Sequence, residues 1–300
     1  MALSLRPLHP LFVAEASGID LRKPLTRTDA RDIEAAMDRH AVLVWRGFRE
    51  TMVADVDTLV ALADREGLLD RDLVVDVTRS RGGSLGPYAL QRLQRRPFIT
   101  TFGNVRLSDV IPLFAEEKRA DFAARNINDG GVPETIDDGA WLMAWLDEDV
   151  GAALEAGAIY TDPVPFKLAH APKGSDGLLS PAPLHFRGGF AVISGPSGGS
   201  HLDQFNAIVK DNGLGALVGM PAGGYSNTWE WSEVLTLPGT DRRLLGFMYD
   251  IGHTLRPNGE VLEGNPASVD VWLPLTAAGL HDYYPRLLEA ALATLGGSRR

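Results

Sequence analysis

Ser200 is the residue whose setting points most clearly to covalent chemistry. It follows the glycine-rich segment 195–199, which separates a buried apolar run at Phe190–Ser194 from a stretch with apolar residues at helical spacing. The sequence therefore predicts a strand, a tight turn and then a helix that opens at Ser200. A serine at such a turn can expose its hydroxyl beside backbone N–H groups and the positive end of a helix dipole, which is what an acyl-transfer nucleophile requires.

The same serine also fits a purely structural role. Asp203 stands three residues after Ser200, which is the spacing of a capping box, where the serine hydroxyl satisfies a backbone N–H group in the first turn of the helix. The two interpretations differ in where the hydroxyl points. A cap turns it onto the helix, whereas a nucleophile leaves it accessible.

A serine hydroxyl needs a base to become an effective nucleophile. We expect His253 to be this base, because it lies in a turn-rich polar segment with Glu263, whose carboxylate could hold the imidazole in one tautomer. His201 is adjacent to the serine, but neighbouring side chains on a helix do not face each other. His40 and His185 are the remaining candidates.

The composition predicts a globular enzyme or binding protein of the cytoplasm. The chain has 300 residues, 45% of them hydrophobic, which suffices for one large domain or two smaller ones. Its net charge of −10 argues against binding to a phosphate backbone, so we expect no nucleic-acid partner. It has no cysteine, which excludes disulfides and a cysteine nucleophile. Neither a secretory signal nor a membrane-spanning run is found in the sequence.

The elements expected around the Ser200 turn alternate between helices and strands. A helix is predicted from Thr28, as its cap, to about His40, and a strand at Ala41–Trp45 follows. The later pattern predicts a helix at Met52–Arg65, strands at Leu73–Thr78 and Ala216–Gly219, and a final helix that begins near Pro285. This alternation predicts an α/β fold with a mostly parallel sheet and flanking helices.

Two stretches near the N-terminus carry a family resemblance. They are RPLHPLFVAEASGIDLRKPL, at Arg6–Leu25, and IEAAMDRHAVLVWRGF, at Ile33–Phe48. They resemble the opening of the TauD/TfdA family of iron- and 2-oxoglutarate-dependent dioxygenases. In that family this segment is scaffold and the chemistry comes later in the chain, so the resemblance implies a short N-terminal arm of residues 1–48.

The rest of the chain carries a second resemblance. Its stretches are LVVDVTRSRGG, GGSHLDQFNAIVKDNGLGALVG and LEGNPASVD, at Leu73–Gly83, Gly198–Gly219 and Leu262–Asp270. They resemble the S41 family of serine peptidases, the tail-specific and tricorn-core group. The resemblance implies a crotonase/ClpP-like domain at residues 49–300 that cleaves a peptide or protein substrate without a cofactor. It places Ser200 at the catalytic serine and Glu263 at an orienting glutamate.

The resemblance also assigns groups that would hold the oxyanion and the substrate. The oxyanion donors would be backbone N–H groups of Gly82, Gly83, Gly199 and Ser200 itself. Aromatic residues next to glycines suit a pocket wall, so we expect Tyr225 and Trp229 to contact the substrate, with Phe102 as a further candidate. One departure from the family is clear. Tyr225 stands where lysine-dependent members of the family have the lysine that acts as the base. Lys210 falls within the predicted helix that opens at Ser200.

Two other interpretations are open. A TauD/TfdA-type dioxygenase would bind Fe(II) through His201, Asp203 and His253, and would hold the 2-oxoglutarate carboxylate with Arg256. Positions i and i+2 of a helix diverge, however, so a helical His201 and Asp203 could not grip one ion. The third interpretation is an S41-like protein without turnover, which binds peptides or helps a homo-oligomer to assemble.

Overall fold

The computed structural model describes residues 3–9, 13–19, 25–40, 42–45, 52–80, 82–83, 85–123, 143–165, 177–226 and 229–296. The chain divides into two compact units, Met1–Thr51 and Met52–Arg300. The predicted boundary at residues 48 and 49 lies outside the described residues, as do Arg81 and Ser84 on either side of Gly82 and Gly83. No helix in the described part of the chain is long and apolar enough to cross a membrane.

The first unit is a three-stranded sheet with one helix. Strand β1 (Ser4–His9) pairs antiparallel with β2 (Val13–Ser17), and β3 (Val42–Trp45) pairs parallel with β2 after helix α1 (Arg27–His40). The cap of α1 is Thr26 rather than the predicted Thr28. The Thr26 hydroxyl accepts a hydrogen bond from the Asp29 N–H, and the Asp29 carboxylate accepts one from the Thr26 N–H.

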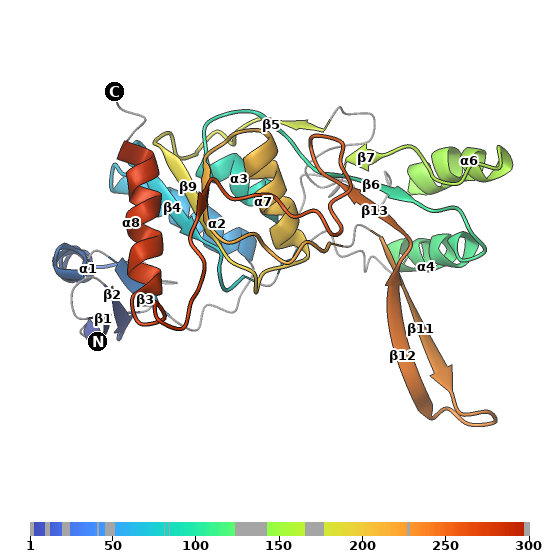
Figure 1. The fold of residues 1–300 in the computed structure, drawn as a ribbon, viewed down its shortest axis with the longest axis horizontal. Coiled ribbons are helices and arrows are strands. Elements are labelled where there is room, and N and C mark those ends of the chain that lie inside the picture. The colour runs from blue at the N-terminus through green and yellow to red at the C-terminus, as the bar shows by residue number, and fades with distance from the viewer. Residues whose placement is uncertain are drawn as a thin grey trace. The chain divides into compact units, whose positions relative to one another are not determined.

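The second unit is built on a four-stranded parallel sheet. Its strands are β4 (Leu73–Asp76), β9 (Phe190–Ser194), β10 (Ala216–Gly219) and β14 (Val271–Trp272), in the order β14-β10-β9-β4. Helices α2 (Met52–Arg65), α3 (Gly86–Leu93), α7 (His201–Asp211) and α8 (Tyr283–Gly296) flank it (Figure 1). The predicted α/β class with a parallel sheet is confirmed, and the crotonase/ClpP-like detail stays a prediction.

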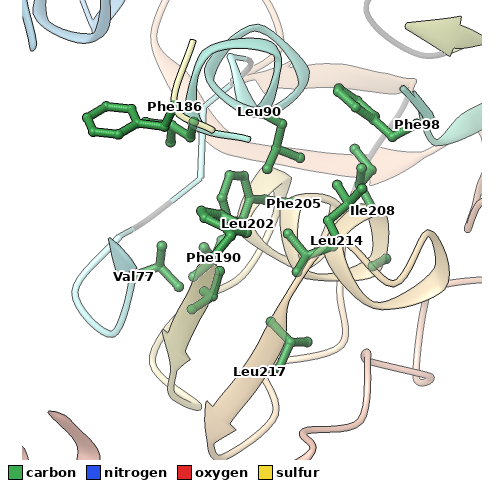
Figure 2. Close-up of a cluster of buried hydrophobic side chains, with 14 of the residues drawn as sticks. Val77, Leu90, Phe98, Phe186, Phe190, Leu202, Phe205, Ile208, Leu214 and Leu217 are labelled. Atoms are coloured by element: carbon green, nitrogen blue, oxygen red, sulfur yellow. The ribbon is translucent and has the colours of Figure 1, made fainter. Parts of the chain in front are cut away.

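Strand β9 lies at the centre of this sheet, and all five of its residues are buried. Successive side chains point to opposite faces. Phe190 and Val192 pack in a cluster with α2, α3 and α7 (Figure 2), whereas Ala191 and Ile193 pack against α8. The strand is therefore fixed on both faces, and the turn that follows it begins from a rigid position. Full burial of an apolar side chain such as that of Phe190 or Val192 stabilises the folded state by roughly 1.5–3 kcal/mol.

A smaller layer packs beside the parallel sheet in the same unit. Strands β13 (Gly252–Leu255), β6 (Phe102–Val105) and β7 (Val164–Pro165) form an antiparallel sheet, and β5 (Phe98–Ile99) pairs with β8 (Leu178–Leu179). Helix α4 (Ile111–Ala123), the π-helical turn η1 (Trp145–Val150) and α6 (Gly151–Glu155) accompany it. A hairpin of β11 (Glu230–Thr236) and β12 (Arg243–Asp250) extends from this layer (Figure 1).

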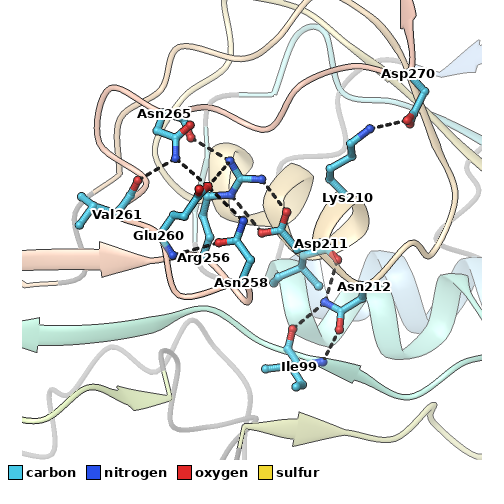
Figure 3. A network of polar contacts seen from close by, with 11 residues as sticks. Ile99, Lys210, Asp211, Asn212, Arg256, Asn258, Glu260, Val261, Asn265 and Asp270 are labelled. Atoms are coloured by element: carbon cyan, nitrogen blue, oxygen red, sulfur yellow. Dashed lines mark hydrogen bonds and ion pairs between the residues drawn. The ribbon is translucent and has the colours of Figure 1, made fainter.

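A buried ion pair joins the end of α7 to the segment after β13. Arg256 donates to both carboxylate oxygens of Asp211, and the two side chains are 7% and 6% exposed. Arg256 also donates to the carbonyl of Asn265, within the polar network of Figure 3. Lys210, on the same helix, forms an ion pair with Asp270 and is more exposed. The Arg256 contact fixes one end of the helix whose other end carries Ser200.

Candidate active site

Ser200 adopts a backbone conformation that is unusual for a residue with a side chain. Its φ is 58° and its ψ is −131°, and among the described residues no other non-glycine residue has a positive φ. Such a conformation costs on the order of 1–3 kcal/mol and persists only where the surroundings enforce it. Ser200 is half-buried, so its side chain is not sealed in the interior.

The capping-box interpretation of Ser200 is wrong. The Ser200 side chain makes no capping hydrogen bond, although its carbonyl accepts one from the Asp203 N–H at 2.9 Å. The positive φ of Ser200 differs from the extended conformation that a capping residue adopts. The hydroxyl is therefore not used to close the first turn of α7.

Asp203 instead clamps a neighbouring loop. Its fully buried carboxylate accepts hydrogen bonds from the N–H groups of Gly224 and Tyr225, each at 3.1 Å. Ser200 donates its own N–H to the carbonyl of Tyr225 at 2.7 Å. Burial raises the pKa of Asp203 and the two N–H donors oppose that shift. Three hydrogen bonds thus hold the 224–225 loop against the start of α7.

Two glycines allow other parts of the chain to approach Ser200 closely. A Cβ on Gly82 would lie 2.8 Å from the Ser200 Cβ and 3.1 Å from the His201 backbone nitrogen. A Cβ on Gly199 would lie 2.0 Å from the Tyr225 ring, which therefore rests on the residue before the serine. The structure brings together the predicted Ser200, Gly82, Gly199 and Tyr225. Tyr225 is 56% exposed beside the turn, where a substrate could reach it.

The predicted oxyanion donors do not all have the same availability. The N–H groups of Gly82 and Gly83 donate to no group in the part of the chain that the structure describes. The Ser200 N–H does not fit its predicted role in this conformation, because it is bonded to Tyr225. The Gly199 N–H likewise donates to no described group, so stabilisation of an oxyanion would depend on Gly199 and the Gly82–Gly83 turn.

Replacing Gly82 by alanine tests this close approach. Gly82 has φ +90°, which is strained for alanine, and the added methyl group would collide with Ser200. We expect the rate of Ser200 acylation to fall by on the order of a hundredfold. The matched control is Gly67→Ala, since Gly67 has φ +67° but nothing within 4 Å of its Cβ position. Acylation rates that fall equally in both variants would show that backbone strain alone, and not contact with Ser200, is responsible.

His253 and Glu263 lie close to the clamped loop but do not form a triad in this conformation. The His253 ring stacks on Tyr160, with centroids 4.9 Å apart, and the Glu263 carboxylate accepts the N–H of Thr254 at 3.2 Å. Thr254, the next residue after His253, donates its hydroxyl to the carbonyl of Ser226 at 2.9 Å. Because Ser200 bonds to Tyr225 and Thr254 to Ser226, the loop links the serine to the neighbourhood of His253. No hydrogen bond joins the His253 ring to the serine hydroxyl or to Glu263 within the described residues.

Glu263 gives the protein a pH-dependent stability. Burial, as the main cause, raises the pKa of Glu263 above the ordinary value of 4.5. The folded state therefore holds the proton more tightly than the unfolded state, and its contribution to the free energy of unfolding decreases as the pH rises from 4.5 through the folded-state pKa. We expect Glu263→Gln to remove this decrease. Urea unfolding across this pH range measures it, and an unchanged pH profile in the variant would contradict the assignment.

The residues of the dioxygenase interpretation lie in four separate environments. A Cβ on Gly86 would be 2.7 Å from the His201 Nε2, whereas the Asp203 carboxylate faces the Gly224 loop. His253 stacks on Tyr160, and Arg256 is paired with Asp211. Among the described residues, no group of three or more histidine, aspartate or glutamate side chains is arranged to hold a metal ion.

Other predicted contributors lie elsewhere. Trp229 is partly buried and packs against the core of the smaller layer, where it stacks on Trp145 at 4.9 Å and meets the edge of Phe114. Its contact with a substrate stays a prediction. His185 is bonded to the carbonyl of Ala182, and the side chain of His40 is outside the described part. Lys210 is paired with Asp270, at the opposite end of α7 from the serine.

Sequence reasoning missed a set of buried polar side chains that hydrogen bonds link to the clamped loop. Thr101 donates to Gln204 Oε1 at 2.6 Å, and Gln204 donates to the Ser226 hydroxyl at 2.6 Å. These hydrogen bonds hold the buried Ser226, the residue that follows Tyr225 in the clamped loop. The one signal in the sequence is Gln204, a polar residue between the apolar positions Leu202 and Phe205 of the helical pattern.

Comparison by sequence finds only partial relatives. No protein-family profile matches the chain. A segment of 47 residues is 51% identical to the alpha-ketoglutarate-dependent 2,4-dichlorophenoxyacetate dioxygenase of Cupriavidus pinatubonensis (strain JMP 134 / LMG 1197), and it covers 16% of each chain. The dioxygenase of the same name from Burkholderia sp. (strain RASC) is 29% identical over 127 residues, 42% of this chain and 35% of that one. The chain thus covers about a third or less of these relatives.

Comparison by structure covers nearly the whole chain. Mature CPAF complexed with lactacystin superposes with a TM-score of 0.59 at 15% identity, over 93% of this chain and 51% of CPAF. Mature CPAF gives a TM-score of 0.58 at 14% identity, over 99% of this chain and 55% of that one. The fold of this chain is therefore similar to that of mature CPAF. The chain spans about half the length of CPAF.

Proposed function

We propose that this protein is a serine-type hydrolase that cleaves a peptide or protein substrate, with Ser200 as the nucleophile. The observation that carries the proposal is the strained backbone of Ser200, with φ 58° and ψ −131°, in a turn where glycine would be unstrained. Strain of this kind gathers at functional sites, where it presents a side chain that a relaxed turn would not present. The S41 peptidase-like fold around the turn supports the same function.

The proposed reaction is acyl transfer. The Ser200 hydroxyl attacks the peptide carbonyl carbon, its proton passes to His253, and the carbonyl oxygen becomes an oxyanion beside the N–H groups of Gly82 and Gly83. The protonated imidazole then donates that proton to the leaving amine, and water releases the acyl group by the reverse sequence. Glu263 orients the imidazole. Because the His253 ring stacks on Tyr160 here, the proposed proton transfer requires the ring to leave Tyr160 and approach the serine hydroxyl.

The second candidate is an S41-like binding protein without turnover. Two observations favour it. The Ser200 N–H is bonded to the Tyr225 carbonyl, and within the described residues no imidazole is bonded to the Ser200 hydroxyl. A dioxygenase that uses Fe(II) and 2-oxoglutarate rests on the partial sequence matches alone. A fluorophosphonate probe, together with an assay for succinate, separates the hydrolase, the binding protein and the dioxygenase. A nucleophilic Ser200 becomes labelled, whereas a binding protein does not react and a dioxygenase forms succinate when Fe(II) and 2-oxoglutarate are added.

The matched control for labelling is Ser197→Ala. Ser197 lies in the same turn but donates its hydroxyl to the carbonyl of Thr78 at 2.6 Å. We expect the probe to label the wild type and Ser197→Ala at Ser200 and to leave Ser200→Ala unlabelled. An adduct at Ser197, or at any residue in Ser200→Ala, would contradict the assignment of the nucleophile.

A further inference from the structure

The hairpin of β11 and β12 is an isolated two-stranded sheet that reaches beyond its layer. Figure 1 shows it extending from the ends of β13 and α4 with its turn as the distal tip. The strands pair antiparallel from Glu230–Asp250 at the base to Thr236–Arg243 near the tip. No other strand in the described part of the chain pairs with either outer edge. A two-stranded hairpin alone in water is only marginally stable, and its open edges invite a further strand.

The base of the hairpin is anchored, but its distal part exposes apolar side chains on both faces. Trp231 and Tyr249 pack against the core of the smaller layer. Beyond them, Leu235 lies opposite Leu245 on one face, while Met248 lies on the other. The exposed apolar residues of this part are Val234, Leu235, Leu237, Leu244, Leu245, Phe247 and Met248, up to 68% exposed at Leu244. On one face Leu235, Leu245 and Phe247 occupy neighbouring positions, and an exposed apolar cluster of this kind marks an interaction site.

The charges of the hairpin are separated along its length. Glu230 and Asp250 lie directly opposite each other at the base, where like charges are destabilising. The tip carries Arg242 and Arg243 with one acidic residue, Asp241. Neither Arg242 nor Asp250 forms an ion pair with any residue that the structure describes. The base is therefore acidic, the tip has a net positive charge, and the two ends complement each other only when two hairpins run in opposite directions.

We propose that β12 pairs antiparallel with β12 of a second copy of this chain, about a two-fold axis at Gly246, to form a four-stranded intermolecular sheet. This register places Arg242 of each copy opposite Asp250 of the other on the same face of the sheet, so each favourable contact occurs twice. The exposed apolar rows of the two hairpins become continuous across the joined edge. A substrate peptide could also add a strand here, but it would lack the complementary charges that a second copy supplies.

Charge reversal with rescue tests the proposal. Sedimentation velocity over a dilution series gives the dimer dissociation constant of the full chain. We expect Arg242→Asp and Asp250→Arg each to weaken dimerisation by about tenfold or more, because each puts like charges into both symmetric contacts. The double variant restores opposite charges and is expected to dimerise within about threefold of the wild type. Arg95→Asp, the same charge change at an exposed position away from the hairpin, should leave the constant unchanged.

The apolar contribution is tested by Met248→Ser, with Leu113→Ser on α4 as the control, because both side chains are more than half exposed in the single chain. We expect Met248→Ser to weaken dimerisation and Leu113→Ser to have no effect. Near-UV circular dichroism establishes that every variant is folded. A chain that stays monomeric at all concentrations would overturn the proposal, and so would a dimer that none of the hairpin substitutions weakens. A double variant no tighter than the single ones would overturn the antiparallel register.

Discussion

Replacing Arg256 by methionine is expected to lower the free energy of unfolding by about 3–5 kcal/mol. The substitution leaves the Asp211 carboxylate, whose side chain is 6% exposed, without the guanidinium that donates to both of its oxygens. A buried charge without a partner is costly because neither water nor protein solvates it. Denaturant unfolding followed by circular dichroism measures the change, since the ion pair joins α7 to the segment after β13.

Two comparisons make this result specific. Lys210→Met removes an ion pair on the same helix that is partly exposed to solvent, so the expected loss is at most about 1 kcal/mol. The double variant Arg256→Met with Asp211→Leu removes both buried charges and should recover much of the loss. If Arg256→Met costs no more than Lys210→Met, the buried pair does not stabilise the end of α7 as described.

The largest effect on activity is expected from Ser200→Ala. The variant keeps the backbone and the surrounding contacts but lacks the attacking oxygen, so the rate of peptide hydrolysis should fall by on the order of 10³–10⁶. The substrate for this measurement is a peptide library, with cleavage followed by mass spectrometry. Ser197→Ala should retain the wild-type rate, because the Ser197 hydroxyl is bonded to Thr78.

A glycine at the same position separates function from stability. Ser200→Gly also lacks the hydroxyl, but glycine adopts φ 58° without the steric cost. We expect this variant to be as inactive as Ser200→Ala. Its free energy of unfolding should exceed that of Ser200→Ala by about 1–2 kcal/mol, because glycine relieves part of the backbone strain. A glycine variant less stable than Ser200→Ala would show that the conformation of Ser200 is not strained, and the main support for its catalytic role would be lost.

Local patterns in the sequence were sufficient to predict the elements around the serine. The strand Phe190–Ser194 and the helix Met52–Arg65 have the predicted bounds, because periodicity and glycine breaks are properties of neighbouring residues. The predicted position of the α1 cap was wrong by two residues. Thr26 and Thr28 have the same side chain, and only the hydrogen bonds distinguish them. Two apolar runs around Pro238 and Gly239 were a hairpin signal that the prediction overlooked.

Contacts between distant segments could not be predicted in the same way. The approach of Gly82 to Ser200 was expected only through the family resemblance, and the bond between Ser200 and the Tyr225 carbonyl was not expected at all. An aromatic residue beside glycines fits a pocket wall and a packed cluster equally well, and the sequence could not predict that Trp229 stacks on Trp145. The roles of His253 and Glu263 and a cytoplasmic location stay predictions.

The most direct test of the central claim is the crystal structure of this protein after reaction with a peptidyl phosphonate. The claim is that the strained turn presents the Ser200 hydroxyl to a carbonyl carbon next to the N–H groups of Gly82 and Gly83. We predict a covalent bond from Ser200 Oγ to phosphorus, with a phosphonyl oxygen within hydrogen-bond distance of at least one of those two N–H groups. An unmodified Ser200, or an adduct whose oxygens point away from the Gly82–Gly83 turn, would contradict the account.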